Sequence, residues 1–118
     1  MKGINLIILF GSQATGQTRP GSDVDVAVLA DHVLSLQEKS DIGQELSLEL
    51  KVSDDIIDII DLQTASPLLQ QQISTHGKLL RGSKDDFIRW RVLTWKIYQD
   101  TAKFRRAREQ ALIKQAHA

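Results

Sequence analysis

Residues 4–29 read INLIILFGSQATGQTRPGSDVDVAVL, and this stretch decides the fold. Residues 4–10 are apolar except for one asparagine, which is typical of a buried strand ending at Gly11. Residues 11–22 contain three glycines and a proline, so they are predicted to form a loop with at most a short helical turn. Valines alternate with acidic or small residues over 24–29, which predicts a second strand with its acidic residues at its beginning.

The middle of the chain alternates between helical and strand patterns. Apolar residues recur four apart toward the end of 34–50, which predicts a helix there. A third buried strand is predicted over 56–60, because these residues are β-branched apart from one aspartate. Ser66 is a helix N-cap followed by proline at the first helical position, and Gly77 is a natural stop for that helix.

The C-terminal third is predicted to be one long helix after a short edge strand at 78–81. Ser83 would cap a helix over 84–114, which is on the order of 45 Å long. A domain of this size has a radius of gyration of only about 13–14 Å, so part of the helix must project, bend or fray. We expect a partner subunit to cover its outer apolar side chains, the alternative being a frayed basic tail after about Arg108.

These elements predict an α+β fold of the α/β two-layer kind: a small mixed sheet with helices packed on it. The 118 residues suit a single domain. Within it we expect a core over 1–82 and a C-terminal helix over 83–118 that is a candidate for partner binding.

Composition narrows the class of protein. The absence of cysteine excludes a disulfide scaffold, a thiolate metal site and a cysteine nucleophile. The longest apolar run is far shorter than the ~20 residues of a membrane span, so a cytoplasmic protein is expected. Residues 1–77 carry four basic and eleven acidic side chains, a net charge of −7, whereas 78–118 carry eleven and four, a net of +7. This separation of charge predicts two surfaces with different partners. The alternative is that the basic residues only form a solvated face of the C-terminal helix.

Polar residues fall at the ends of the predicted strands, where chemistry is usually placed. Gly11 and Ser12 end the first strand, Asp23 and Asp25 open the second, and Asp58 lies within the third. A glycine–serine turn can cradle a phosphate oxygen with its backbone N–H groups. Clustered carboxylates repel one another unless a cation lies between them, and their oxygens suit Mg²⁺. The pattern therefore predicts metal-assisted phosphoryl or nucleotidyl transfer.

These motifs resemble those of a known family. The segments LFGSQATG at 9–16, SDVDVAV at 22–28 and IDIIDL at 57–62, extended at 65–67 and 76–80, are similar to the minimal nucleotidyltransferases of the polymerase-β superfamily. The whole pattern resembles the MntA-type antitoxins, which are paired with HepT toxins of the HEPN ribonuclease class. The resemblance implies an enzyme that transfers AMP from ATP to a tyrosine hydroxyl of the toxin and so silences its RNA cleavage.

The resemblance also implies roles for individual residues. Gly11 and Ser12 would hold the triphosphate, and Asp23 and Asp25 would bind Mg²⁺, with two ions expected. Asp58 would be the third carboxylate, ligating the metal and helping to activate the acceptor hydroxyl. The partner would be a HEPN toxin in a hetero-oligomer, and direct nucleic-acid binding is not expected.

The roles of some polar residues have open alternatives. Arg19 is a candidate triphosphate contact, the alternative being an ordinary loop cation. Asp61 is a rival of Asp58, but an offset of three residues points it to the opposite strand face, and capping of the turn at 63–64 is the favoured interpretation. His76 lies just before a predicted helix stop, where it complements the helix dipole.

The sequence departs from the family at its start. Family members usually have a helix before the first strand, whereas only residues 1–3 precede it here. One patch of the sheet is therefore expected to be uncovered. The alternative function is a catalytically weak or inactive module that neutralises a toxin by binding and occlusion.

Overall fold

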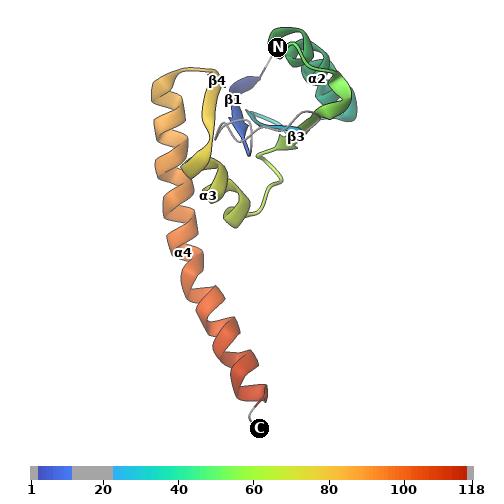
Figure 1. Ribbon diagram of the computed structural model, residues 1–118. Coiled ribbons are helices and arrows are strands. Elements are labelled where there is room, and N and C mark those ends of the chain that lie inside the picture. The colour runs from blue at the N-terminus through green and yellow to red at the C-terminus, as the bar shows by residue number, and fades with distance from the viewer. Residues whose placement is uncertain (1–2, 12–22, 117–118) are drawn as a thin grey trace.

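The computed structural model describes residues 3–11 and 23–116. Its centre is a four-stranded sheet with the strand order β3-β2-β1-β4 (Figure 1). β1 pairs antiparallel with both β2 and β4, whereas β2 and β3 run parallel. The predicted mixed sheet is thus confirmed, and 78–81 forms an edge strand as expected. The strands are β1 (Ile4–Phe10), β2 (Val24–Ala30), β3 (Ile57–Asp61) and β4 (Lys78–Arg81).

Helices cover both faces of this sheet. α2 (Leu36–Leu50) packs on one face, where its Ile42 and Leu46 are buried against the valines of β2. α3 (Pro67–His76) and the start of α4 (Lys84–Ala116) cover the other face through Ile73 and Trp90. The structure therefore has one helical layer more than the two-layer arrangement expected. The reason is that β1 and β2 bury side chains on both of their faces, so each face needs a cover.

Two element boundaries differ from the sequence prediction. α2 begins at Leu36 rather than at residue 34, because Ser35 is its N-cap and forms a capping box with Glu38. Leu34 is buried in the core but precedes the helix. β3 runs from Ile57 to Asp61, one residue later than expected, since a 3₁₀ turn, η1 (Asp54–Ile56), leads into it.

α4 extends well past the sheet, which gives the molecule dimensions of 57 × 32 × 27 Å (Figure 1). The first turns pack on the body, where Trp90 and Thr94 are buried. Large apolar side chains farther along are exposed to solvent, among them Phe104, Leu112 and Ile113. The predicted projection is confirmed, and the helix continues through the described residues to Ala116 instead of fraying after Arg108. None of the described helices is both long and apolar enough to cross a membrane.

Lys51 ends α2 in a left-handed conformation, with φ 57° and ψ 45°. This conformation brings Cβ too close to the carbonyl oxygen of the same residue's peptide, and glycine avoids that contact. We therefore expect Lys51→Gly to raise the free energy of unfolding by about 0.5–1 kcal/mol in urea denaturation. Lys51→Ala is the matched control, because it removes the charge but keeps the Cβ; equal gains from both variants would contradict the conformational explanation.

His32 connects the end of β2 to the start of α2 through two side-chain hydrogen bonds. Its Nδ1 lies 2.6 Å from Asp31 Oδ1 and its Nε2 lies 2.6 Å from Glu38 Oε2. The hydrogen bond to Asp31, followed by that to Glu38, raises the pKa of His32 above its ordinary value of 6.5. The folded state therefore binds the imidazolium proton more tightly than the unfolded chain does.

This raised pKa predicts a pH-dependent contribution to stability. The contribution is complete below the unfolded pKa of about 6.5 and disappears as the pH rises through the higher folded pKa. Wild type should thus lose stability relative to His32→Gln between pH 6 and pH 9, measured as the difference in thermal midpoint at each pH. A difference that is constant over this range would show that folding does not strengthen proton binding by His32.

Candidate functional site

Two carboxylates face each other across the parallel pair β2–β3. Asp25 and Asp58 are direct register partners, so their side chains lie on the same face of the sheet. This is the face that α3 covers, because Ala27, two residues after Asp25, is buried in the cluster with Ile73. Asp23 is exposed and lies one residue before the start of β2.

The surroundings of Asp25 disfavour its negative charge. Burial raises the pKa of the Asp25 carboxyl, and the nearby charges of Asp58 and Asp23 raise it further. Each of these effects is relieved when a cation is placed between the carboxylates. The acidic group is therefore electrostatically unfavourable by itself and suited to binding a positive charge.

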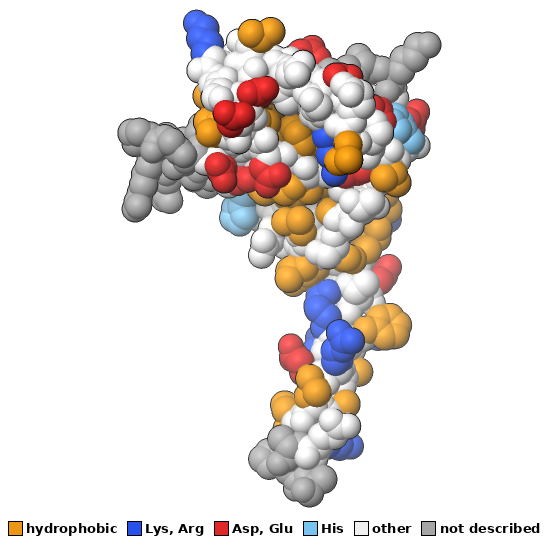
Figure 2. All heavy atoms as spheres, turned by 90° about the vertical axis from the view of Figure 1, so that its right-hand side faces the viewer, with side chains coloured by type: hydrophobic (Ala, Val, Ile, Leu, Met, Phe, Trp, Pro, Cys, Tyr) orange, Lys and Arg blue, Asp and Glu red, His pale blue; other side chains and the backbone are white. Residues whose placement is uncertain are grey.

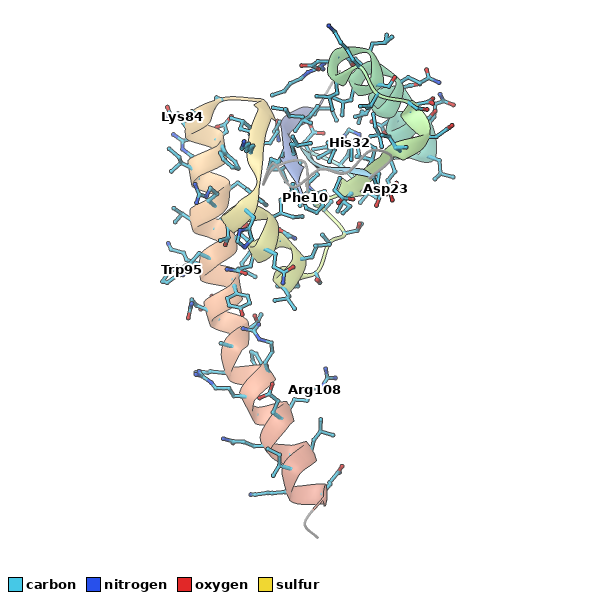
Figure 3. All side chains as sticks on the ribbon, in the orientation of Figure 1. Phe10, Asp23, His32, Lys84, Trp95 and Arg108 are labelled. Atoms are coloured by element: carbon cyan, nitrogen blue, oxygen red, sulfur yellow. The ribbon has the colours of Figure 1, made fainter. Side chains whose placement is uncertain are left out.

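Gly11 leaves the space that the Asp25 carboxylate occupies. It follows β1 with φ +75°, and its neighbour Phe10 is the register partner of Asp25. Figure 3 labels Phe10, which ends β1, and Asp23, which precedes β2. A Cβ added to Gly11 would lie 2.6 Å from Asp25 Oδ2. Both the positive φ and the close approach of Asp25 favour glycine at position 11. The position of the Asp25 carboxylate therefore depends on the glycine in this turn.

Asp61 serves the fold rather than the acidic site. Its side chain is buried, with 4% exposed, and its register partner is Val28, on the face that α2 covers. Asp61 Oδ2 accepts a hydrogen bond from the backbone N–H of Leu34 at 2.8 Å, and Oδ1 accepts one from that of Gln63 at 2.9 Å. The sequence interpretation of Asp61 as a turn cap on the opposite face is therefore confirmed.

The structure brings together only part of the predicted site. Gly11, Asp23, Asp25 and Asp58 lie at one end of the sheet, whereas Ser12 and Arg19 lie outside the described residues. Within 3–11 and 23–116, no three carboxylate or imidazole groups are close enough together to form a metal site. The assignment of Asp23, Asp25 and Asp58 as metal ligands therefore stays a prediction.

Further charged residues lie at this end of the sheet and were not assigned to the site from the sequence. Asp54 and Asp55 form the turn that leads directly into the start of β3. His76 ends α3 next to β1, and Lys78 is paired with Leu9 at the start of β4. Figure 2 shows several acidic side chains close together on one face of the body. Only the strand order places 76–78 near Gly11, which no spacing in the sequence indicates.

Comparison with known families agrees with this geometry. The family model described as Polymerase beta, Nucleotidyltransferase matches residues 1–86. The chain belongs to this nucleotidyltransferase family. The glycine turn and the acidic strand ends thus lie within the part of the chain that the family model matches.

Two curated relatives share most of the chain. The Protein adenylyltransferase MntA of Shewanella oneidensis is 37% identical over 110 residues, which cover 93% of this chain and 74% of the relative. The Protein adenylyltransferase MntA of Aphanizomenon flos-aquae is 34% identical over 100 residues, covering 76% of this chain and 67% of the relative. The resemblance to MntA-type enzymes is therefore confirmed.

Solved structures extend the likeness to the fold of the whole chain. A toxin–antitoxin crystal structure with AMP-PNP matches with a TM-score of 0.74 at 35% identity, covering 100% of this chain and 90% of that one. A structure of the tri-AMPylated Shewanella oneidensis HEPN toxin in complex with the MNT antitoxin matches with a TM-score of 0.67 at 33% identity, covering 100% and 87%.

The contact between Gly11 and Asp25 makes a testable prediction. Gly11→Ala places a methyl group where Asp25 Oδ2 lies and disfavours the φ of +75°. We expect nucleotidyl transfer to fall by about 100-fold, the order of loss that misplacing a reacting group by ~1 Å causes. The free energy of unfolding should fall by only about 1–2 kcal/mol. Activity is followed by release of pyrophosphate and stability by urea denaturation; full activity in the folded variant would contradict the prediction.

Proposed function

We propose that this chain is an ATP- and Mg²⁺-dependent protein adenylyltransferase that transfers AMP to a tyrosine of a cognate HEPN ribonuclease toxin and acts as its antitoxin. The pair Asp25–Asp58 beside Gly11 is the observation that carries this proposal, since it places two carboxylates suited to a cation directly against a glycine turn. The two MntA relatives and the toxin–antitoxin structures support the same reaction and the same class of partner.

The acidic residues fit Mg²⁺ in their chemistry. Carboxylate oxygens are the ligands that Mg²⁺ prefers, and a cation would relieve the repulsion that raises the pKa of Asp25. Asp23, Asp25 and Asp58 would hold the metal, with two ions expected. When bound, Mg²⁺ would neutralise the charge of the triphosphate and lower the pKa of the acceptor hydroxyl.

The residues of this chain would then position the substrates for an in-line displacement. The tyrosine oxygen forms a bond to the α-phosphorus of ATP, and the bond from that phosphorus to the oxygen bridging to the β-phosphate breaks. Pyrophosphate leaves, and Asp58 helps to accept the phenolic proton. Gly11 and Ser12 would hold the triphosphate, and Arg19 would contribute a further contact.

The toxin would present the acceptor, as the similarity to structures of toxin–antitoxin complexes supports. α4 offers a basic and partly apolar surface that projects from the body, and we propose that it contributes to docking within a hetero-oligomer. Both ATP and a ribonuclease toxin are found in the cytoplasm, where we expect the protein to act.

Intact-mass spectrometry of the toxin tests the proposal. The toxin from the neighbouring gene is incubated with this protein, ATP and Mg²⁺, beside the double variant Asp23→Asn/Asp25→Asn. We expect a mass gain of one AMP or a small multiple with wild type and none with the variant. No gain, together with a stable complex, would replace the proposal by neutralisation through occlusion.

Asp58 and Asp61 provide a matched pair of variants on one strand. Asp58→Asn should lower transfer by at least about 100-fold and leave stability unchanged. Asp61→Asn should lower the free energy of unfolding by about 1–3 kcal/mol, because it weakens a buried hydrogen-bond acceptor, while transfer by the folded protein stays within a few fold. The opposite pattern would assign the third carboxylate to Asp61.

A further inference from the structure

One side of α4 packs on the body at its start and continues into solvent. Thr94 is buried on this side, with 4% exposed. Residues three or four apart lie on the same side of a helix, so this side can be followed along the projecting part of α4. Burial decreases along it until Leu112, which is 59% exposed. This body-facing side of α4 consists, after Thr94, of Tyr98, Thr101, Arg105, Arg108 and Leu112.

Neutral groups fix the side chain of Arg105 on the body-facing side. Its Nη1 donates a hydrogen bond to Thr101 Oγ1 at 2.7 Å, and its Nη2 donates one to the backbone carbonyl oxygen of Tyr98 at 3.3 Å. The guanidinium carbon also lies 4.2 Å from the centre of the Tyr98 ring. These contacts hold the guanidinium in one place, but none of them neutralises its charge with a carboxylate.

The positive charge of Arg105 has no acidic partner within the part of the chain that the structure describes. Arg81, in contrast, forms ion pairs with both Glu45 and Glu49. A guanidinium has five N–H donors, so the Arg105 side chain keeps donors for a carboxylate from another molecule. Arg108 is the next residue along the same side and is exposed. Two arginines on a side without an acidic residue are suited to binding an anionic group.

α4 projects past the end of the sheet that carries Asp25. β4 runs antiparallel to β1 and begins opposite Leu9, so it leads away from this end. α4 then reverses the direction of the chain and extends beyond the end at which β1 finishes (Figure 1). In Figure 3, Arg108 points to the side of α4 on which the sheet lies. A protein bound along the body-facing side would therefore lie next to the acidic end of the sheet.

We propose that Arg105 and Arg108 bind carboxylates on the surface of the partner toxin and so place its acceptor tyrosine at the site of transfer. This inference rests on the proposed function, because it specifies which surface of this chain the toxin contacts and the chemistry of that contact. Tyr98 is a positioning residue, since its ring and its carbonyl oxygen fix the guanidinium of Arg105.

The composition of the body-facing side favours an acidic protein over the other possible occupants. Binding along an RNA backbone uses a longer series of cations, whereas this side combines two arginines with neutral side chains and the apolar Leu112. Arginine beside aromatic and apolar groups is typical of protein interfaces. The α4 helix of a second copy would bring further positive charge to the same side.

Calorimetric binding of the toxin from the neighbouring gene tests the inference in the absence of ATP, so that no transfer occurs. Arg105→Gln in the full-length chain should weaken binding by about 30-fold, as for an arginine that dominates an interface. Lys103→Gln is the matched control, because Lys103 lies nine residues after Thr94 and thus on the opposite side of the helix. It removes the same charge and should change the affinity by no more than about two-fold.

Two substitutions of Tyr98 test its positioning role. Tyr98→Ala removes the ring beneath the guanidinium and should weaken toxin binding by about 3- to 5-fold, whereas Tyr98→Phe keeps the ring and should bind as wild type does. Because Tyr98 acts through Arg105, Tyr98→Ala should cost little more once Arg105→Gln is present. Fully additive losses would overturn the positioning role.

Further measurements separate this site from general effects. Thermal midpoints and AMP-PNP affinity should be unchanged in every variant, and Arg108→Gln gives a second, independent loss of toxin affinity. Wild-type affinity in the double variant Arg105→Gln/Arg108→Gln would overturn the inference, as would an equal loss in Lys103→Gln. Binding of a single-stranded RNA oligonucleotide that Arg105→Gln abolishes, with toxin affinity unchanged, would assign the surface to RNA instead.

The two proposals can fail separately. A wild-type chain that binds the toxin through Arg105 but adds no AMP to it would disprove the transferase function and leave the docking site intact. Normal transfer by wild type, together with wild-type affinity in the double variant, would disprove the docking site alone.

Discussion

Repulsion between Asp25 and Asp58 is the constraint around which this end of the molecule is organised. Parallel pairing of β2 with β3 places the two residues directly opposite each other. Burial, and after it the charge of Asp58, raises the pKa of the Asp25 carboxyl. The fold keeps this unfavourable arrangement because the strands are held elsewhere. Asp61 lies three residues after Asp58, and its carboxylate stabilises the far end of β3 by accepting hydrogen bonds from two backbone N–H groups. The valines of β2 are buried under α2. An electrostatic cost at one end of the strands is thus offset by packing at the other, as is common in sites that bind cations.

Glycines adapt the other strands to this pair of carboxylates. Gly11 leaves room for Asp25, and Gly77 lets the end of α3 lie against β1. Because both glycines are needed for close approach, the site has little freedom to shift without loss of contacts. Antiparallel pairing of β4 with β1 places Lys78 at the same end of the sheet as Gly11, but on the face that α2 covers and not on the face of Asp25 and Asp58.

The net negative charge of residues 1–77 and the net positive charge of residues 78–118 lie in different parts of the fold. Most acidic residues lie in or next to the sheet and α2, whereas most basic residues lie on α4, which projects away from the sheet. Separation along a single long helix keeps the basic surface from neutralising the acidic site. The exposed Phe104, Leu112 and Ile113 lie on this projecting part, where the body of the chain does not cover them. A surface of this kind suits a protein acceptor better than a small molecule.

Local patterns determined much of this protein by themselves. The apolar run before Gly11, the alternation after Asp23 and the caps at Ser66 and Ser83 are short-range signals, and the elements they predict are present because backbone geometry and burial act over neighbouring residues. The resemblance of the same motifs also indicated the family. Tertiary structure alone decided that Asp25 faces Asp58, that helices cover both faces, and that the start of β4 lies at the same end of the sheet as Gly11. These relations depend on strand order and register, which are fixed by the packing of segments that are distant in the sequence, and no spacing along the chain records them.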